Sequence, residues 1–281
     1  MINNIEIYNS RMDASIEDKL WFIDKVDADI YIDFGCANGN LLKHLAYIHN
    51  KRYNKFNHYI GYDINDEMIK KATQNCSRYG CITFTNKIDK VKEYCNTHNK
   101  YKNKKVCLIL SSVMHEIYSY STQTEIFRFW SDIKYSIYPD YIVIRDMTYG
   151  INEMSDYNMY DYIDDYVSDM IRKVRYNAYS RQITDYEHHW GKICSLKSLT
   201  HFLLKYKYVE NWDREVKENY LPISTFLIKN ILSALYNVIH EEYYCLPYLK
   251  KQFKKDFDID FICHTHYKIM FQLKYKLTLI N

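Results

Sequence analysis

A strand, a glycine loop and a helix follow one another in residues 29–45, with the sequence DIYIDFGCANGNLLKHL. The chain has only six glycines in 281 residues, yet Gly35 and Gly39 both fall in this loop. Glycine permits a positive φ and a close approach of backbone to a ligand, and the free N–H groups that open the next helix favour an anionic or polar partner. The segment therefore predicts a strand-to-helix turn of a parallel α/β sheet that binds a ligand.

A second strand-to-helix unit begins at residue 58, with the sequence HYIGYDINDEMIKKA. Its strand ends in Asp63, which lies 24 residues after Gly39. That is close to the spacing of about 20 residues at which a carboxylate meets the ribose hydroxyls of a nucleotide-like cofactor. A carboxylate can accept two hydrogen bonds from a diol, so Asp63 is predicted to bind a ribose.

These residues resemble the class I S-adenosylmethionine-dependent methyltransferases. The residues that are similar to their first motif, acid-x-Gly-x-Gly-x-Gly, are Asp33, Gly35, Cys36, Ala37, Asn38 and Gly39. Ala37 replaces the middle glycine, for which we expect a slightly different turn and retained binding. A nicotinamide or flavin site is disfavoured, because G-x-G-x-x-G anchored at Gly35 would need glycines at Ala37 and Asn40.

The resemblance implies S-adenosyl-L-methionine as the cofactor. Besides the first motif, the residues that it implies as cofactor-binding are Asp63, Ile64, Asn86, Lys87, Ser111 and Ser112. Residues 86–89 occupy the place where this family sets a polar side chain against the adenine edge. Which of the four does so is left open.

Five apolar strand segments alternate with helices over residues 29–146, which predicts a doubly wound, parallel α/β sheet with helices on both faces. A sixth strand is expected at residues 206–212 and an amphipathic helix at residues 222–242. Residues 267–279 alternate apolar and polar side chains, as a strand does. This fits the antiparallel last strand of the seven-stranded sheet that the resemblance implies.

Four segments are expected along the chain. Residues 1–27 form an N-terminal helical segment, with a helix over residues 16–26, and residues 28–150 form the cofactor-binding α/β core. The regular alternation then stops, so residues 151–200 are interpreted as a helical insertion or lid over the acceptor site. Residues 201–281 are expected to complete the sheet, with helices.

The fourth strand delivers residues 111–116, SSVMHE, to the carboxyl edge of the sheet, where α/β proteins hold their ligands. Many small-molecule methyltransferases have a similar small polar residue, apolar pair and histidine here. His115 and Glu116 are therefore the candidate catalytic residues. As a general base, His115 would lose activity as the pH falls through an unperturbed imidazole pKa near 6.5; as a structural residue it would cap the helix below the cofactor.

Composition excludes several classes of protein. A net charge of +3 does not by itself indicate nucleic acid, and no apolar run approaches the 18 residues of a membrane span. Eight cysteines without a C-x-x-C pair indicate a reducing, cytoplasmic setting without structural zinc, and the N-terminus does not resemble a signal peptide. The sequence predicts no metal site, because ligand spacing is missing around His188, His189, His201, His264 and His266.

The sequence thus predicts methyl transfer from S-adenosylmethionine to an unidentified acceptor. A histidine after the fourth strand, in place of an Asn-Pro-Pro-aromatic motif, favours a small molecule over RNA. The alternatives are an RNA-modifying methyltransferase and a catalytically silent cofactor-binding subunit that supports a partner. Residues 211–220 mix polar and aromatic side chains and are predicted to recognise the acceptor or to form a structural ion-pair network. The oligomeric state is not indicated.

Overall fold

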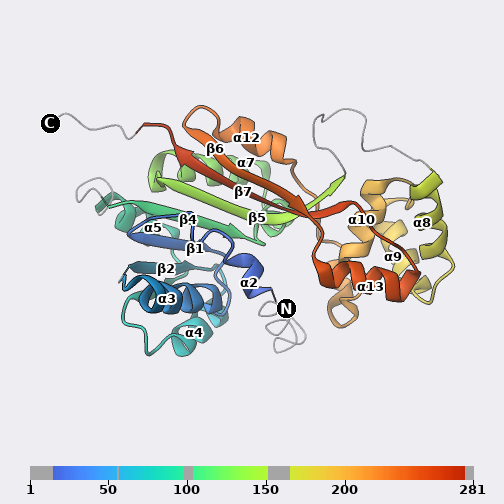
Figure 1. Cartoon of the computed structure of the whole chain (residues 1–281), viewed down its shortest axis with the longest axis horizontal. Coiled ribbons are helices and arrows are strands. Elements are labelled where there is room, and N and C mark those ends of the chain that lie inside the picture. The colour runs from blue at the N-terminus through green and yellow to red at the C-terminus, as the bar shows by residue number, and fades with distance from the viewer. Residues whose placement is uncertain (1–14, 56, 98–103, 151–164, 276–281) are drawn as a thin grey trace.

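The first half of the chain alternates strands and helices (Figure 1). The computed structural model describes residues 15–55, 57–97, 104–150 and 165–275. The elements up to residue 150 are α2 (Ile16–Lys19), β1 (Ile30–Phe34), α3 (Asn40–Tyr53), β2 (His58–Tyr62), α4 (Asp66–Asn75), β3 (Ile82–Thr85), α5 (Ile88–Cys95), β4 (Val106–Ser111), α6 (Met114–Tyr120), α7 (Gln123–Ser131), the π-helix η2 (Asp132–Ile137) and β5 (Tyr141–Gly150). The five predicted strands are all present.

The second half of the chain is mainly helical and contributes two further strands. Its elements are α8 (Asp165–Arg175), α9 (Ser180–Trp190), α10 (Leu196–Lys205), the 3-10 helix η3 (Val209–Asn211), α11 (Trp212–Glu215), α12 (Thr225–Leu232), β6 (Tyr236–Tyr244), α13 (Pro247–Phe257) and β7 (His264–Leu273). Residues 151–164, where the predicted insertion begins, lie outside the described residues.

One seven-stranded sheet organises the molecule, with the strand order β3-β2-β1-β4-β5-β7-β6. Strands β1 to β5 pair in parallel, and β7 runs antiparallel to both β5 and β6. The prediction of a doubly wound, mostly parallel sheet with an antiparallel last strand is confirmed. Because the parallel strands run the same way, β1, β4 and β5 end at one edge of the sheet.

Apolar residues on successive positions of the central strands face opposite layers of helices. Ile30 and Ile32 pack in a cluster with residues of α5, α7 and α12, whereas Tyr31 packs with residues of α3 and the segment after α2. In the middle strand, Leu108 and Ile109 divide between the same two clusters. Burial on both faces is what the five consecutive apolar residues of β4 predict.

A third apolar cluster lies outside the sheet and forms a helical body. It combines residues from 167–221 with residues from 245–263, so that α13 packs with α8 and α10. Figure 1 shows α8, α9, α10 and α13 together beyond the end of the sheet toward which β5 runs. The helical body therefore adjoins the carboxyl edge of the parallel strands.

Two expected elements in the second half are wrong. Residues 206–212 form no strand, because η3 and α11 occupy this stretch and Trp212 is buried in the helical body. The predicted helix over 222–242 breaks after Leu232, and β6 follows. As the edge strand, β6 pairs with β7 alone and is largely exposed, so it lacks the apolar periodicity of an inner strand.

The N-terminal helix is shorter than expected. The sequence predicts a helix over residues 16–26, but α2 ends at Lys19 and residues 20–25 form turns. Phe22 and Val26 are nevertheless buried in the cluster that covers one face of the sheet. The segment therefore packs on the sheet without the predicted helical length.

Gly39 tests how tightly the glycine loop is built. Gly39 has φ of +77°, and a Cβ placed there would lie 2.7 Å from Cζ of Phe84. We expect Gly39→Ala to lower the free energy of unfolding by about 2 to 4 kcal/mol, through the left-handed backbone and the crowding together. Urea denaturation measures this change.

The matched control is Gly80→Ala. Gly80 is outside the positive-φ region and a Cβ there would meet no atom within 4 Å. This variant should keep wild-type stability or gain a few tenths of a kcal/mol. Equal stabilities for the two variants would contradict the close packing of the loop against β3.

Candidate functional site

The glycine loop between β1 and α3 is held against the end of β2. The N–H groups of Gly35 and Cys36 donate to the carbonyl of Tyr62, at 2.8 and 2.9 Å. Gly35 has φ of +82° and Ala37 has φ of +45°, so the alanine in place of the middle glycine adopts the left-handed conformation that glycine prefers. The altered motif keeps a tight turn at this position.

Asp63 joins the two strand-to-helix turns. Its Oδ2 accepts a hydrogen bond from the N–H of Ala37, and its Oδ1 accepts one from the N–H of Asn65, both at 2.9 Å. Burial raises the pKa of the Asp63 carboxyl, although both backbone donors oppose the shift. Each carboxylate oxygen has a further lone pair, so the group can still accept hydrogen bonds from a diol.

A narrow cavity, here called the glycine-loop cavity, lies between this loop, α2 and the end of β4. Its lining residues are Ile16, Lys19, Asp33, Gly35, Cys36, Ala37, Asn38, Asn40, Leu41 and Ser111. The Ser111 hydroxyl is buried and has no hydrogen-bond partner in the described part of the chain. Burial raises the pKa of Asp33 to about 7, against the nearby charge of Lys19. The Ser111 hydroxyl without a partner in the described residues and the buried Asp33 carboxyl fit a polar ligand at this site.

The structure divides the predicted cofactor residues into three groups. Asp33, Gly35, Cys36, Ala37, Asn38 and Ser111 line the glycine-loop cavity, and Gly39 caps α3 beside it. Ser112 lies in a neighbouring cavity. The exposed residues are Ile64, Asn86 and Lys87, of which Asn86 donates a hydrogen bond to Asp66.

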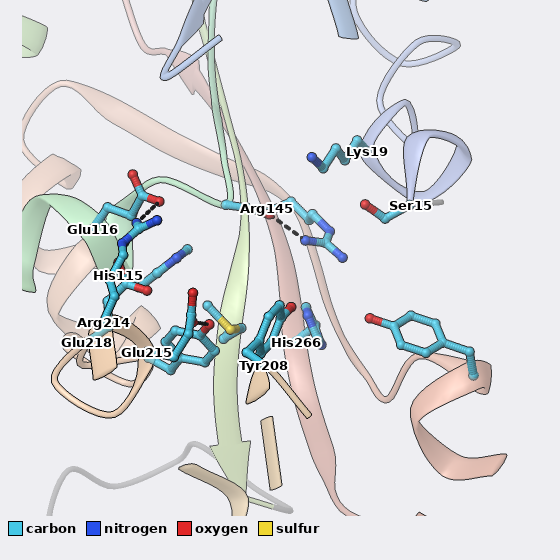
Figure 2. Close-up of a pocket in the computed structure, with 14 residues that line it drawn as sticks. Ser15, Lys19, His115, Glu116, Arg145, Tyr208, Arg214, Glu215, Glu218 and His266 are labelled. Carbon is cyan, nitrogen blue, oxygen red and sulfur yellow. Dashed lines mark hydrogen bonds and ion pairs between the residues drawn. The ribbon is translucent and has the colours of Figure 1, made fainter. Parts of the chain in front are cut away.

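The second cavity has a volume of about 110 Å³ and is here called the histidine cavity. Its lining residues are Ser15, Lys19, Ser112, His115, Glu116, Arg145, Met147, Tyr208, Arg214, Glu215, Glu218, Tyr220, Tyr248 and His266 (Figure 2). Lys19 lines both cavities, and the adjacent residues Ser111 and Ser112 line one each. The two cavities are therefore neighbours at the end of β4.

Asp146 of β5 fixes the imidazole of His115 in the histidine cavity. The Nδ1 atom of His115 lies 2.9 Å from Oδ1 of Asp146, and both side chains are buried. Oδ2 of the same carboxylate accepts the N–H of Met114 at 2.8 Å, at the start of α6. With Nδ1 bound in this way, Nε2 remains available for a ligand, because no other described group bonds it.

The charge of His115 differs from the expectation of an unperturbed imidazole. Burial opposes protonation, but the Asp146 carboxylate outweighs it and raises the pKa of His115 to about 9. The pKa of Asp146 is lowered in turn, because the imidazolium and the backbone donors outweigh burial. The expectation of a pKa near 6.5 is wrong, since the sequence does not show that the carboxylate lies in contact.

Glu116 has a different partner from His115. Its Oε1 lies 3.0 Å from the guanidinium of Arg214, which also binds Glu218 at 2.9 Å. Burial raises the pKa of Glu116, against the charges of His115 and Arg214. Asp146 therefore orients the imidazole, and Glu116 belongs to an ion-pair network with the segment after α11.

Arg145 links the cavity to α2. Its guanidinium donates to Oδ2 of Asp18 at 2.8 Å and to the hydroxyl of Ser112 at 2.7 Å. Asp18 also accepts hydrogen bonds from Lys268 and Tyr244, both at 2.7 Å. This network ties α2 to β5, β6 and β7 beside the two cavities.

Residues 25–130 match the family model described as a methyltransferase domain. The match covers less than half of the chain, and the matched region contains the glycine loop, Asp63 and His115. This part of the chain is therefore similar to a methyltransferase domain, in agreement with the predicted resemblance.

Solved structures similar to this chain include three methyltransferases. The methyltransferase domain of bacterial CtHen1-C is 12% identical over 92% of this chain and 97% of that one, with a TM-score of 0.46. A SAM-dependent methyltransferase from Anabaena variabilis is 12% identical over 93% and 84%, with a TM-score of 0.48. The N-methyltransferase NodS from Bradyrhizobium japonicum, in complex with S-adenosyl-L-homocysteine, is 11% identical over 94% and 87%, with a TM-score of 0.46. No curated protein matches the sequence.

Within the described residues, no three His, Cys, Asp or Glu side chains are grouped so that they could hold a metal ion. The helices in the same ranges are all too short or too polar to span a bilayer. All eight cysteines are described, and all are free thiols.

Residues 211–220, predicted to recognise the acceptor or to form an ion-pair network, contribute Arg214, Glu215, Glu218 and Tyr220 to the histidine cavity. The ion pairs of Arg214 with Glu116 and Glu218 confirm the network, and acceptor recognition stays a prediction. No residue of 165–200 lines either cavity. A lid role for residues 151–200 stays a prediction.

The ion pair of His115 and Asp146 predicts a loss of stability at alkaline pH. The imidazole of His115 has a higher pKa in the folded chain, about 9, than in the unfolded chain, about 6.5. The ion pair therefore stabilises the fold fully below about pH 6.5, and this stabilisation is lost as the pH rises through about 9. For this buried pair we expect a loss of about 2 to 3 kcal/mol over that range, measured by urea denaturation. His115→Gln should remove this dependence of the free energy of unfolding on pH, and the half-buried control His44→Gln should retain it. A slope unchanged in His115→Gln would contradict the assignment.

Proposed function

We propose that this chain transfers a methyl group from S-adenosylmethionine to a small molecule bound in the histidine cavity. The observation that carries the proposal is the meeting of two cavities at the end of β4, within a methyltransferase domain. One contains the glycine loop and the unpaired Ser111 hydroxyl, and the other contains the His115 imidazole. A small acceptor is favoured because the helical body walls the histidine cavity and limits its volume to about 110 Å³.

The residues present fit the cofactor. Bound there, S-adenosylmethionine supplies an electrophilic methyl group on a sulfonium, whose sulfur keeps the electron pair of the broken S–C bond. In the proposal, Asp63 accepts hydrogen bonds from the ribose hydroxyls, while the glycine loop and Ser111 bind its polar groups. Holding the two reactants in line is worth roughly 7 to 11 kcal/mol, so positioning by the two cavities supplies most of the acceleration.

His115 is proposed to receive the proton that the acceptor loses. Nδ1 is held by Asp146, which leaves Nε2 as the atom that takes the proton when the acceptor forms its new bond to the methyl carbon. The neutral imidazole needed for this step forms as the pH rises toward 9. Base catalysis of this kind contributes about 10² to 10⁴ in rate.

Methyl-labelled S-adenosylmethionine tests the function. The purified protein is incubated with labelled cofactor and, separately, with a small-metabolite extract and an RNA extract, and we expect label in the small-molecule fraction. Label in RNA alone would favour the RNA-modifying alternative. Cofactor binding without transfer in either extract would favour the catalytically silent subunit.

Asp63→Ala is predicted to weaken both S-adenosylmethionine and its demethylated product by about 10- to 100-fold, because charged hydrogen bonds to the ribose are lost. Calorimetry measures both affinities, and Glu67→Ala is a matched control in the exposed first turn of α4. Unchanged affinities in Asp63→Ala would remove the ribose assignment. Nicotinamide nucleotides should not bind the wild-type protein.

His115→Ala is predicted to lower turnover by about 10² to 10⁴ while cofactor affinity stays close to wild type. Wild-type turnover should rise with pH toward the raised imidazole pKa of about 9. A purely structural His115 would instead give a joint loss of stability and cofactor affinity, with no imidazole step in the pH profile.

A further inference from the structure

One side of the histidine cavity is formed by α11 and the residues after it. This side has more carboxylates than cationic groups to neutralise them. Glu116, Glu215 and Glu218 all line it, and Arg214 is the guanidinium among them. Arg214 donates to Glu116 and Glu218, at 3.0 and 2.9 Å. Within the described residues no ion pair reaches the carboxylate of Glu215.

Glu215 is a buried carboxylate with an incompletely satisfied side chain. It is 3% exposed, and its Oε2 accepts a hydrogen bond from the hydroxyl of Tyr220. No other group in the described ranges donates to this carboxylate, so Oε1 has no donor among those residues. A buried carboxylate without its full set of donors is costly, which a ligand that donates there would relieve.

The nearby cations have other partners. His115 is bound by Asp146. Lys205, which is fully buried, donates to the backbone carbonyl of Glu218 at 2.5 Å and lies 4.8 Å from the ring centroid of Tyr220. Burial lowers the pKa of this lysine to about 7, although the charges of the two glutamates oppose the shift. Lys205 thus gives Glu215 no direct hydrogen bond.

The opposite side of the same cavity is basic. Figure 2 shows Lys19 and Arg145 on the side away from Glu116, Glu215 and Glu218. The basic side adjoins the glycine-loop cavity, because Lys19 lines both. The cavity therefore has a positive end beside the glycine loop and a negative end at α11.

We propose that Glu215 binds a positively charged nitrogen of the methyl acceptor, so that the acceptor is a small amine. An ammonium group donates up to three hydrogen bonds, and Oε1 of Glu215 is the acceptor atom that lacks a donor. Its charge also compensates the acids at this end of the cavity, whereas a phosphate or carboxylate there would be repelled. This inference rests on the proposed function, since it assigns the acceptor to the histidine cavity. It concerns binding and adds no covalent step.

Paired probes of equal size test the inference. Each pair contains an amine and the alcohol that replaces it, such as ethanolamine with ethylene glycol, propylamine with propanol, and tyramine with tyrosol. Binding to the wild-type protein is measured by calorimetry at neutral pH in the presence of S-adenosylhomocysteine. We expect at least one amine to bind about 10-fold or more tightly than its alcohol, as charged hydrogen bonds do.

Glu215→Gln should abolish this preference, because the amide keeps the shape and loses the charge. Asp213→Asn is the matched control, since Asp213 lies on the same short helix and is exposed outside this cavity. The control should keep the preference. Affinity for S-adenosylhomocysteine and the thermal midpoint show whether each variant is folded.

Equal binding of amine and alcohol in every pair, or no binding by any amine, would overturn the inference, even if Glu215→Gln does not fold. A preference that persists in folded Glu215→Gln would also overturn it. Methyl transfer to neutral or anionic acceptors alone would support the proposed function and contradict this inference. Amine-selective binding without any methyl transfer would support Glu215 as an amine-binding residue and contradict the proposed function.

Discussion

The carboxyl edge of the parallel strands imposes the constraint on which the site depends. A helix that starts at such an edge has backbone N–H groups without helical partners, and these must be satisfied when they are buried. Asp146 at the end of β5 accepts the N–H of Met114 and binds the imidazole of His115 with its other oxygen. One buried carboxylate thereby fixes both the start of α6 and the direction of the ring. The same residue favours the protonated imidazole at neutral pH, because its carboxylate raises the pKa of His115.

The features that could be predicted from the sequence are those that depend on residues close together in the chain. The glycine loop and the apolar run of β4 each need only neighbouring residues to be recognised, and both are present. The alternation predicted a last strand over residues 267–279; β7 covers His264–Leu273, and residues 276–279 lie outside the described residues. Asp63 follows from spacing along two adjacent units, and it lies against Ala37 as a residue of this loop should. The position of His115 at the edge follows from the end of β4.

The remainder depends on contacts between residues far apart in the chain. Arg214 meets Glu116 across 98 positions, and Asp18 meets Tyr244 across 226. No periodicity encodes such pairs, so the sequence predicted an ion-pair network or acceptor recognition at residues 211–220 without identifying Glu116 as a partner. The strand β6 was missed for another reason, because an exposed edge strand has no buried face whose apolar period could be read.

The placement of β7 between β5 and β6 has a consequence for the order in which the protein can form during synthesis. Strand β6 pairs with β7 alone, and one side of β5 is paired only by β7. Until residues 264–273 have left the ribosome, β5 presents an unpaired apolar edge and β6 has no partner in the sheet. Unpaired edges of this kind are where chains associate wrongly, so the nascent chain is most exposed to aggregation just before its last strand arrives.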